Sequence, residues 1–153
     1  MCIEENHMFK NFLGELSVLF SYPKHLMILA VRLMLAYGFS KPALLKLSDI
    51  TATAKWFESI SIPFYTFLAY VVSMLETLGI VLLILGLFTR QIAFLLACVM
   101  VGAIFFVHLT HGFSVANNGI EIPLYYLLFL FVLASYGGGK YSFDNFLFKD
   151  GNQ

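Results

Sequence analysis

The chain has 153 residues, of which 60% are hydrophobic and only 12% are charged, and its mean hydropathy is +0.86. Soluble domains carry about 25% charged residues, so this composition leaves too little polar surface for a water-facing globule and predicts a membrane protein. Nine Lys and Arg balance nine Asp and Glu, which excludes the basic surface that nucleic-acid binding requires. The cysteines Cys2 and Cys98 form no CxxC motif and no Cys/His cluster, which excludes a dithiol motif and a structural zinc site.

The first 24 residues form a predicted N-terminal segment with its own pattern. Apolar residues recur at helical spacing from Phe9 to Phe20, with polar residues on the opposite face. This pattern predicts a short helix in the membrane interface, and an extra turn packed on the bundle is an equally good interpretation. Glu4, Glu5 and the late start of the apolar run argue against a cleaved signal peptide.

Four apolar segments follow, and each approaches the roughly 20 residues that a spanning helix needs. Long apolar runs without alternation are helices, because the backbone finds no water to bond within lipid. The predicted fold is therefore all-α, a membrane-embedded four-helix bundle over residues 25–147, with a C-terminal tail at 148–153. The predicted spans are residues 25–39, 61–88, 91–110 and 122–139.

The connections between the spans carry turn and interface signals. Ser40 and Pro42 are predicted to end the first span, and residues 51–60 to form a short helix whose Trp56 and Phe57 lie at headgroup level. Four spans place both termini on one side of the membrane. Five Lys and Arg on that side against three on the other favour cytoplasmic termini.

Two ionisable residues interrupt the first two spans, Arg32 and Glu76. A charge at the centre of a spanning helix costs about 2.5 to 3.5 kcal/mol, so such residues are kept where they find partners or water. From the helical rise, Arg32 lies about 10 Å deep and Glu76 about 18 Å, a gap that a guanidinium can cover. We therefore predict a contact between Arg32 and Glu76. Small residues near Glu76, including Ser73 and Gly79, predict that this face points inward.

His108 and Glu121 are predicted to meet near the opposite membrane surface, at the end of the third span and the start of the fourth. With Arg32 and Glu76 they would form a polar track, or a ligand pocket, from this rim toward the middle of the bundle. Three interpretations stay open: ion pairs that only fix packing, a substrate or quinone pocket, and a proton path. No residue is assigned a catalytic role.

The sequence does not contain the motifs of other cofactor sites. No pair of histidines faces each other at one depth, as transverse haem ligation requires, and no Glu-x-x-His repeat predicts a di-iron site. Nucleotide-binding and hydrolase motifs are absent from the sequence. We expect no intrinsic cofactor and no metal, so any redox chemistry would be carried by a quinone or by a partner subunit.

The ionisable residues belong to an ordered set of short motifs that resembles the DoxX family of small bacterial membrane proteins. The resemblance covers about residues 30–147. In chain order the motifs are Arg32 with Gly38-Phe39, Trp56 before Pro63, Glu76 with Gly79, Gly86-Leu87-Phe88-Thr89-Arg90, His108 with Gly112-Phe113, Gly119-Ile120-Glu121, and Gly137-Gly138-Gly139-Lys140-Tyr141-Ser142-Phe143-Asp144.

The resemblance implies a four-span inner-membrane protein, associated in some members with a quinol oxidase or a thiosulfate:quinone oxidoreductase and in others with oxidative-stress partners. The resulting hypothesis is a membrane subunit of a quinone-linked oxidoreductase, at most a quinone-binding one. The alternative is a non-catalytic scaffold that binds a partner subunit or further copies of itself. A small transporter is less favoured, because the second and third spans contain no internal proline at which a helix could break.

Overall fold

The computed structural model describes residues 14–15 and 23–147, and this part of the chain is helical without any strand. The predicted all-α fold is confirmed. The predicted interfacial helix falls almost entirely outside the described residues, and so does the tail at 148–153. The helices are α2 (Lys24–Ser48), α3 (Ile50–Ser59), α4 (Tyr65–Leu85), α5 (Thr89–Ala103), α6 (Glu121–Tyr136) and α7 (Phe143–Leu147).

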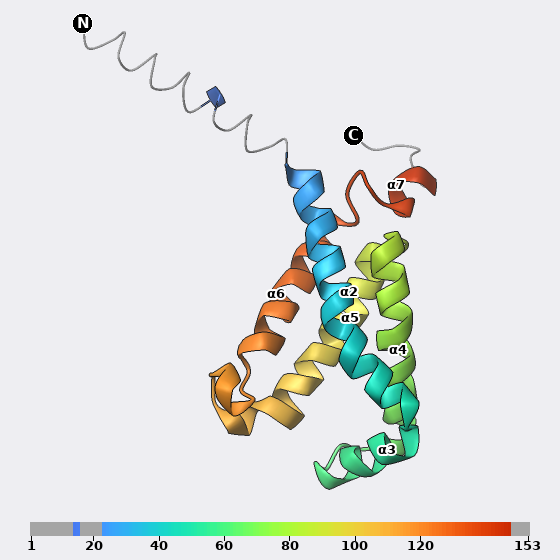
Figure 1. Ribbon diagram of the computed structural model, residues 1–153, viewed down its shortest axis with the longest axis vertical. Coiled ribbons are helices and arrows are strands. Elements are labelled where there is room, and N and C mark those ends of the chain that lie inside the picture. The colour runs from blue at the N-terminus through green and yellow to red at the C-terminus, as the bar shows by residue number, and fades with distance from the viewer. Residues whose placement is uncertain (1–13, 16–22, 148–153) are drawn as a thin grey trace, which may run out of the picture.

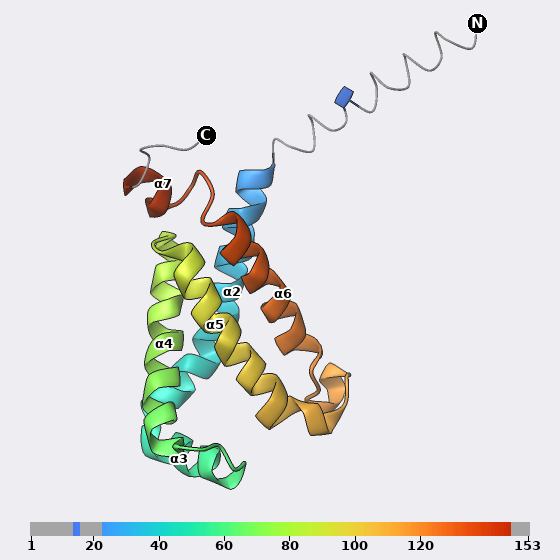
Figure 2. The same ribbon diagram turned by 180° about the vertical axis from the view of Figure 1, so that it is seen from behind.

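The four long helices pack as two pairs, α2 along α4 and α5 along α6 (Figures 1 and 2). One end of the molecule, here called the terminal end, holds the start of α2, the turn between α4 and α5, and α7. The opposite end, the α3 end, holds α3. A buried apolar core joins the pairs and includes Leu35, Phe39, Leu83, Leu96, Leu130 and Leu133.

Three helical segments in the described chain are long and apolar enough to cross a membrane: Lys24–Ser48, Tyr65–Leu85 and Thr89–His111. The third continues α5 through a π-helical stretch, Ile104–His108, and a 3-10 turn, Leu109–His111. Helix α6 is apolar, but its 16 residues rise only about 24 Å, less than the roughly 30 Å of hydrocarbon. It is shorter than predicted because the chain leaves the helix at Gly137, where φ is +74°.

The first helix is much longer than predicted, and Pro42 does not end it. Proline removes one backbone donor, here the one that would bond the Gly38 carbonyl, at a cost of about 3 kcal/mol. The residues on either side, Phe39 and Ala43, are fully buried, and this packing keeps the helix continuous. The consequence is that Lys46, expected in a loop, stands in the last turn of α2.

Helix α3 forms where it is predicted, and its start is explained by Asp49. The Asp49 carboxylate accepts a hydrogen bond from the Ala52 amide at 2.8 Å, the usual N-cap contact. Of the two aromatic residues predicted at headgroup level, Trp56 is exposed, whereas Phe57 is buried against Ala54 and Ala69. Phe57 therefore packs α3 onto α4 instead of facing the membrane surface.

Candidate functional site

Arg32 is fully buried, and its hydrogen bonds within the described part of the chain all go to backbone carbonyls. Its Nε donates to Leu83 at 2.8 Å and its Nη2 to Ile84 at 2.8 Å, while its Nη1 donates to Gly138 at 3.0 Å and Tyr141 at 2.8 Å. The last carbonyls of an α-helix have no partner within the helix. Arg32 therefore caps α4 and at the same time fixes the segment that follows α6. We call this arrangement the Arg32 clamp.

Two residues beside the Arg32 clamp, Gly86 and Asp144, support its geometry. Gly86 ends α4 with φ at +71°, and a methyl group there would overlap the Arg32 guanidinium. Asp144 accepts hydrogen bonds from the Phe88 amide at 2.6 Å and the Thr89 amide at 2.8 Å, so it caps α5. The Asp144 amide in turn donates to the Gly86 carbonyl at 3.0 Å. Three distant motifs of the sequence thus meet at the terminal end.

A second polar centre lies between α2 and α4, toward the α3 end. The Lys46 Nζ donates to both carboxylate oxygens of Glu76, at 2.6 and 2.7 Å. Glu76 is only 1% exposed, whereas the Lys46 side chain is 21% exposed. Ser73 lies one turn before Glu76 on the same buried face, and its hydroxyl finds no partner among the described residues. Lys46, Ser73 and Glu76 together are here called the Lys46–Glu76 centre.

The predicted contact between Arg32 and Glu76 is wrong. Arg32 and Lys46 are 14 residues apart on α2, about 21 Å along its axis. Glu76 lies on α4 beside Lys46, so it is far from Arg32 along the bundle. Arg32 turns toward the unpaired carbonyls at the near end of α4, and Glu76 is already paired with Lys46. Sequence reasoning missed Lys46 because Pro42 was taken as the end of the helix.

One part of that reasoning is confirmed, namely the inward face of α4. The structure buries the small residues Ala69, Ser73 and Gly79 together with Glu76 and Leu83. The Cβ of an alanine at position 79 would lie 2.9 Å from a methyl carbon of Leu96, so Gly79 lets α5 approach closely.

His108 and Glu121 both bond to the loop between α5 and α6, and the described contacts do not join the two side chains to each other. The His108 Nδ1 donates to the Asn118 carbonyl at 2.7 Å. The Glu121 carboxylate accepts from the Val115 amide at 2.9 Å and, more weakly, from the Tyr125 hydroxyl at 3.4 Å. Both residues fold the loop between α5 and α6, and the described contacts do not join them to Arg32 or Glu76. The continuous polar track is therefore not formed, and a ligand role for either residue stays a prediction.

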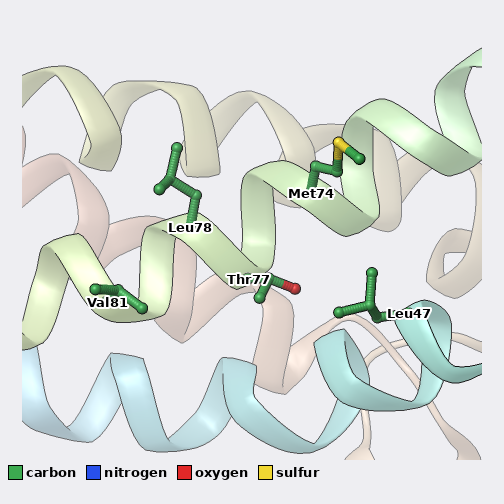
Figure 3. A pocket seen from close by; sticks show the side chains of 5 residues that line it. All are labelled: Leu47, Met74, Thr77, Leu78 and Val81. Carbon is green, nitrogen blue, oxygen red and sulfur yellow. The ribbon is translucent and has the colours of Figure 1, made fainter.

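An open groove of about 300 Å³ runs between α2 and α4 (Figure 3). Leu47 contributes from α2, and the other four lining residues come from α4. Only Thr77 is polar, and its hydroxyl donates to the Ser73 carbonyl at 2.8 Å. Leu47, Met74 and Thr77 directly follow Lys46, Ser73 and Glu76 in the chain. The groove therefore lies at the same depth in the bundle as the Lys46–Glu76 centre. The lining residues are Leu47, Met74, Thr77, Leu78 and Val81.

The described residues contain no group of three or more His, Cys, Asp or Glu side chains positioned to hold a metal ion. Cys98, on α5, is a free and exposed thiol.

Comparison with known proteins gives one family and three relatives. The sequence model of the DoxX family matches residues 27–109. A Bacillus subtilis (strain 168) protein named "Putative oxidoreductase CatD" is 33% identical over 121 residues, which cover 79% of this chain and 87% of that protein. No solved structure matches.

Two proteins of Haemophilus influenzae (strain ATCC 51907 / DSM 11121 / KW20 / Rd), both named "Uncharacterized protein", match over shorter stretches. One is 46% identical over 83 residues, or 52% of this chain and 61% of that protein. The other is 37% identical over 68 residues, or 44% of this chain and 45% of that protein. The matched regions therefore span about half to three fifths of these two relatives.

Proposed function

The chain belongs to the DoxX family of membrane proteins, and from this premise we propose that it is a membrane subunit of a quinone-linked oxidoreductase. The name of the Bacillus subtilis relative, which matches most of the chain, supports the oxidoreductase class. The observation that carries the proposal is the apolar groove between α2 and α4, at the depth of the Lys46–Glu76 centre. Binding sites for small molecules are mostly apolar with a few polar groups that fix orientation. A quinone, with an apolar tail and two ring carbonyls, matches that combination.

In this proposal the groove holds the tail, and a ring carbonyl accepts a hydrogen bond from the Lys46 ammonium, because the hydroxyl of Thr77 in the groove already donates to the Ser73 carbonyl. The Lys46 ammonium has three donors, two of which are used by Glu76, so one remains. The Arg32 clamp takes no part in binding, since four of its five donors are held by carbonyls. Its role is to hold α2 and α4 in register.

The experiment is a quinone titration of the purified protein in mild detergent, comparing Leu78→Trp with Leu128→Trp. Leu78 lines the groove, whereas Leu128 lies on α6, and the two side chains are about equally exposed, at 55% and 54%. We expect saturable binding by the wild type and by Leu128→Trp, and at least a tenfold weaker affinity in Leu78→Trp. No saturable binding, or equal affinity in both variants, contradicts the proposal.

We also propose that the terminal end faces the cytoplasm in a bacterial inner membrane. Lys24, Arg90 and Lys140 lie at this end, and on the other side Lys46 is neutralised by Glu76. A fluorescent reporter that matures only in the cytoplasm, fused after the last residue, should be bright. An alkaline phosphatase fused at the same place should be inactive. Active phosphatase with a dark reporter reverses the orientation.

The second candidate function is a non-catalytic scaffold that binds a partner subunit or another copy of itself. The Arg32 clamp favours it, because the most buried charge among the described residues is used to hold α2, α4 and the segment after α6 together. Native purification in mild detergent tests this function by the mass of the eluted species. A monodisperse monomer without partner or self-association contradicts it.

A further inference from the structure

The Lys46–Glu76 centre has hydrogen-bonding capacity that the described residues do not use. A carboxylate accepts about four hydrogen bonds, whereas Glu76 receives two, both from one Lys46 nitrogen. The Ser73 hydroxyl, fully buried one turn away, receives and donates none. Buried polar groups in proteins are nearly always hydrogen-bonded, to protein atoms or to ordered water. The unused capacity therefore favours a mobile proton or a water molecule beside Glu76.

The centre is partly exposed on one side. Lys46 stands in the last turn of α2, and its side chain is 21% exposed while Glu76 is 1% exposed. Its flexible stem thus links the buried carboxylate to the α3 end. Toward the terminal end, the fully buried side chains of Leu35, Phe39 and Leu83 fill the space between the helices. Protons can therefore reach Glu76 from the α3 end and not through the core.

Lys46 is the charge that faces Glu76 from the helices packed against α4. Arg32, on the same helix as Lys46, is held in its clamp at the far end. Asp49, between α2 and α3, is exposed and caps α3. His25, at the start of α2, is half-buried and accepts a hydrogen bond from the Lys140 amide at the terminal end. The remaining ionisable side chains of these helices are exposed: Lys24, Tyr37 and Lys41 on α2, Lys55 and Glu58 on α3, Tyr65 and Tyr70 on α4, and Arg90 and Cys98 on α5. Among the described residues, Lys46 is thus the charged group that contacts the Glu76 carboxylate.

We propose that the Lys46–Glu76 centre is a proton-exchange site inside the membrane. A proton from water at the α3 end binds a Glu76 oxygen, and the carboxylate becomes a carboxylic acid. The hydrogen bonds from Lys46 then break, and its ammonium extends into the water at that end. The centre gains one positive charge, and no electron moves. Buried ionisable residues of membrane proteins commonly mark such proton sites, and Ser73 is placed to bond the new acid directly or through water.

The first experiment makes Glu76 the only glutamate of the chain. The protein is labelled with carboxyl-¹³C glutamate, placed in lipid nanodiscs, and followed by infrared spectroscopy as the pH is lowered while circular dichroism confirms that the helices persist. We expect a reversible conversion of the labelled carboxylate band into a carboxylic acid band. A band that stays carboxylate at every pH at which the helices persist overturns the proposal. The other glutamates, all changed to glutamine, are Glu4, Glu5, Glu15, Glu58 and Glu121.

The second experiment adds Lys46→Met to this chain, with Lys41→Met as the matched control on the exposed side of the same helix. Loss of the facing ammonium should change the pH at which the labelled carboxylate band converts into the acid band, because the Lys46 ammonium contacts this carboxylate. Lys41→Met should leave the midpoint unchanged. Equal midpoints in the two variants overturn the proposal, and if Lys46→Met does not fold, the first experiment decides alone. Neither readout needs a quinone, so the outcome is independent of the function proposed above.

Discussion

Arg32 and Lys46 stand on the same helix, yet the protein stabilises their charges in different ways, Arg32 by backbone carbonyls and Lys46 by a carboxylate. Arg32 gives four hydrogen bonds to carbonyls of two separate segments and is fully buried, so its planar fork is fixed on every side. Lys46 gives two bonds from one nitrogen to a single carboxylate and stays partly exposed. The first arrangement holds the fold together, and the second can open without disturbing any backbone contact. The comparison therefore separates a structural charge from one that can exchange protons.

The largest effect is expected from Arg32→Met, which leaves the carbonyls of Leu83, Ile84, Gly138 and Tyr141 without their donor. A buried polar group without a partner costs about 1 to 3 kcal/mol, so the free energy of unfolding should fall by at least about 3 kcal/mol. Thermal unfolding in detergent, followed by the fluorescence of Trp56, measures the loss. Arg32→Lys should recover part of it. If Arg32→Met were as stable as the wild type, the Arg32 clamp would not be the contact that stabilises the terminal end.

The next largest effect on stability is expected at the Lys46–Glu76 centre. Lys46→Met alone leaves a buried carboxylate without its cation and should cost about 3 kcal/mol of stability. The double variant Lys46→Met with Glu76→Leu removes both charges and should lie within about 1 kcal/mol of the wild type. Urea titrations of the singles and the double give the coupling energy. Additive effects would mean that the two side chains do not depend on each other.

A smaller effect is expected at Gly86, where an alanine would collide with the Arg32 guanidinium and would have to adopt a positive φ. Gly86→Ala should lower stability by about 1 to 3 kcal/mol. Gly102→Ala is the matched control, because Gly102 lies in α5 with no atom within 4 Å of the added methyl. The control should be neutral or more stable by about 0.5 to 1 kcal/mol. Equal melting temperatures of the two variants would show that the Arg32 clamp does not require a glycine at position 86.

The smallest effect concerns the start of α3. The Ala52 amide and the Thr51 hydroxyl, which both donate to Asp49, lower the pKa of Asp49 below its ordinary value of 3.8. Because the pKa is lower in the folded state, the stabilisation is present above pH 3.8 and is lost as the pH falls below it. Trp56 fluorescence should therefore change in this range for the wild type, and Asp49→Asn should abolish that change. An identical pH titration in both proteins would contradict the assignment of this change to Asp49.

The sequence predicted the positions of the helices better than the contacts between their charged side chains. The helical content, the short α3 and the inward face of α4 all follow from local patterns, because apolar runs and small residues at helical spacing need no knowledge of the rest of the fold. The end of α2 was wrong because Pro42 is an ordinary helix-stop signal. Packing of Phe39 and Ala43 overrode it.

The candidate site was predicted in part. Arg32 and Glu76 were singled out correctly as buried charges, since ionisable residues in apolar segments must lie away from lipid. Their pairing could not be inferred, because opposite charges at similar depth look like partners in a sequence, while carbonyls at a helix end carry no sequence signal. Ser73 was noted only as a small residue, and its unpartnered hydroxyl became visible once α2 and α4 were packed together.

The sequence by itself determined that this is a helical membrane protein of the DoxX family with charges held inside its bundle, because composition and periodicity are local properties of the chain. Only the tertiary structure decided which groups those charges meet. Residues separated by 51 to 109 positions come together in the Arg32 clamp, and Lys46 reaches Glu76 across 30 positions. Such contacts depend on how far each helix continues and how the helices lie against one another, and the burial of side chains from the whole bundle sets both.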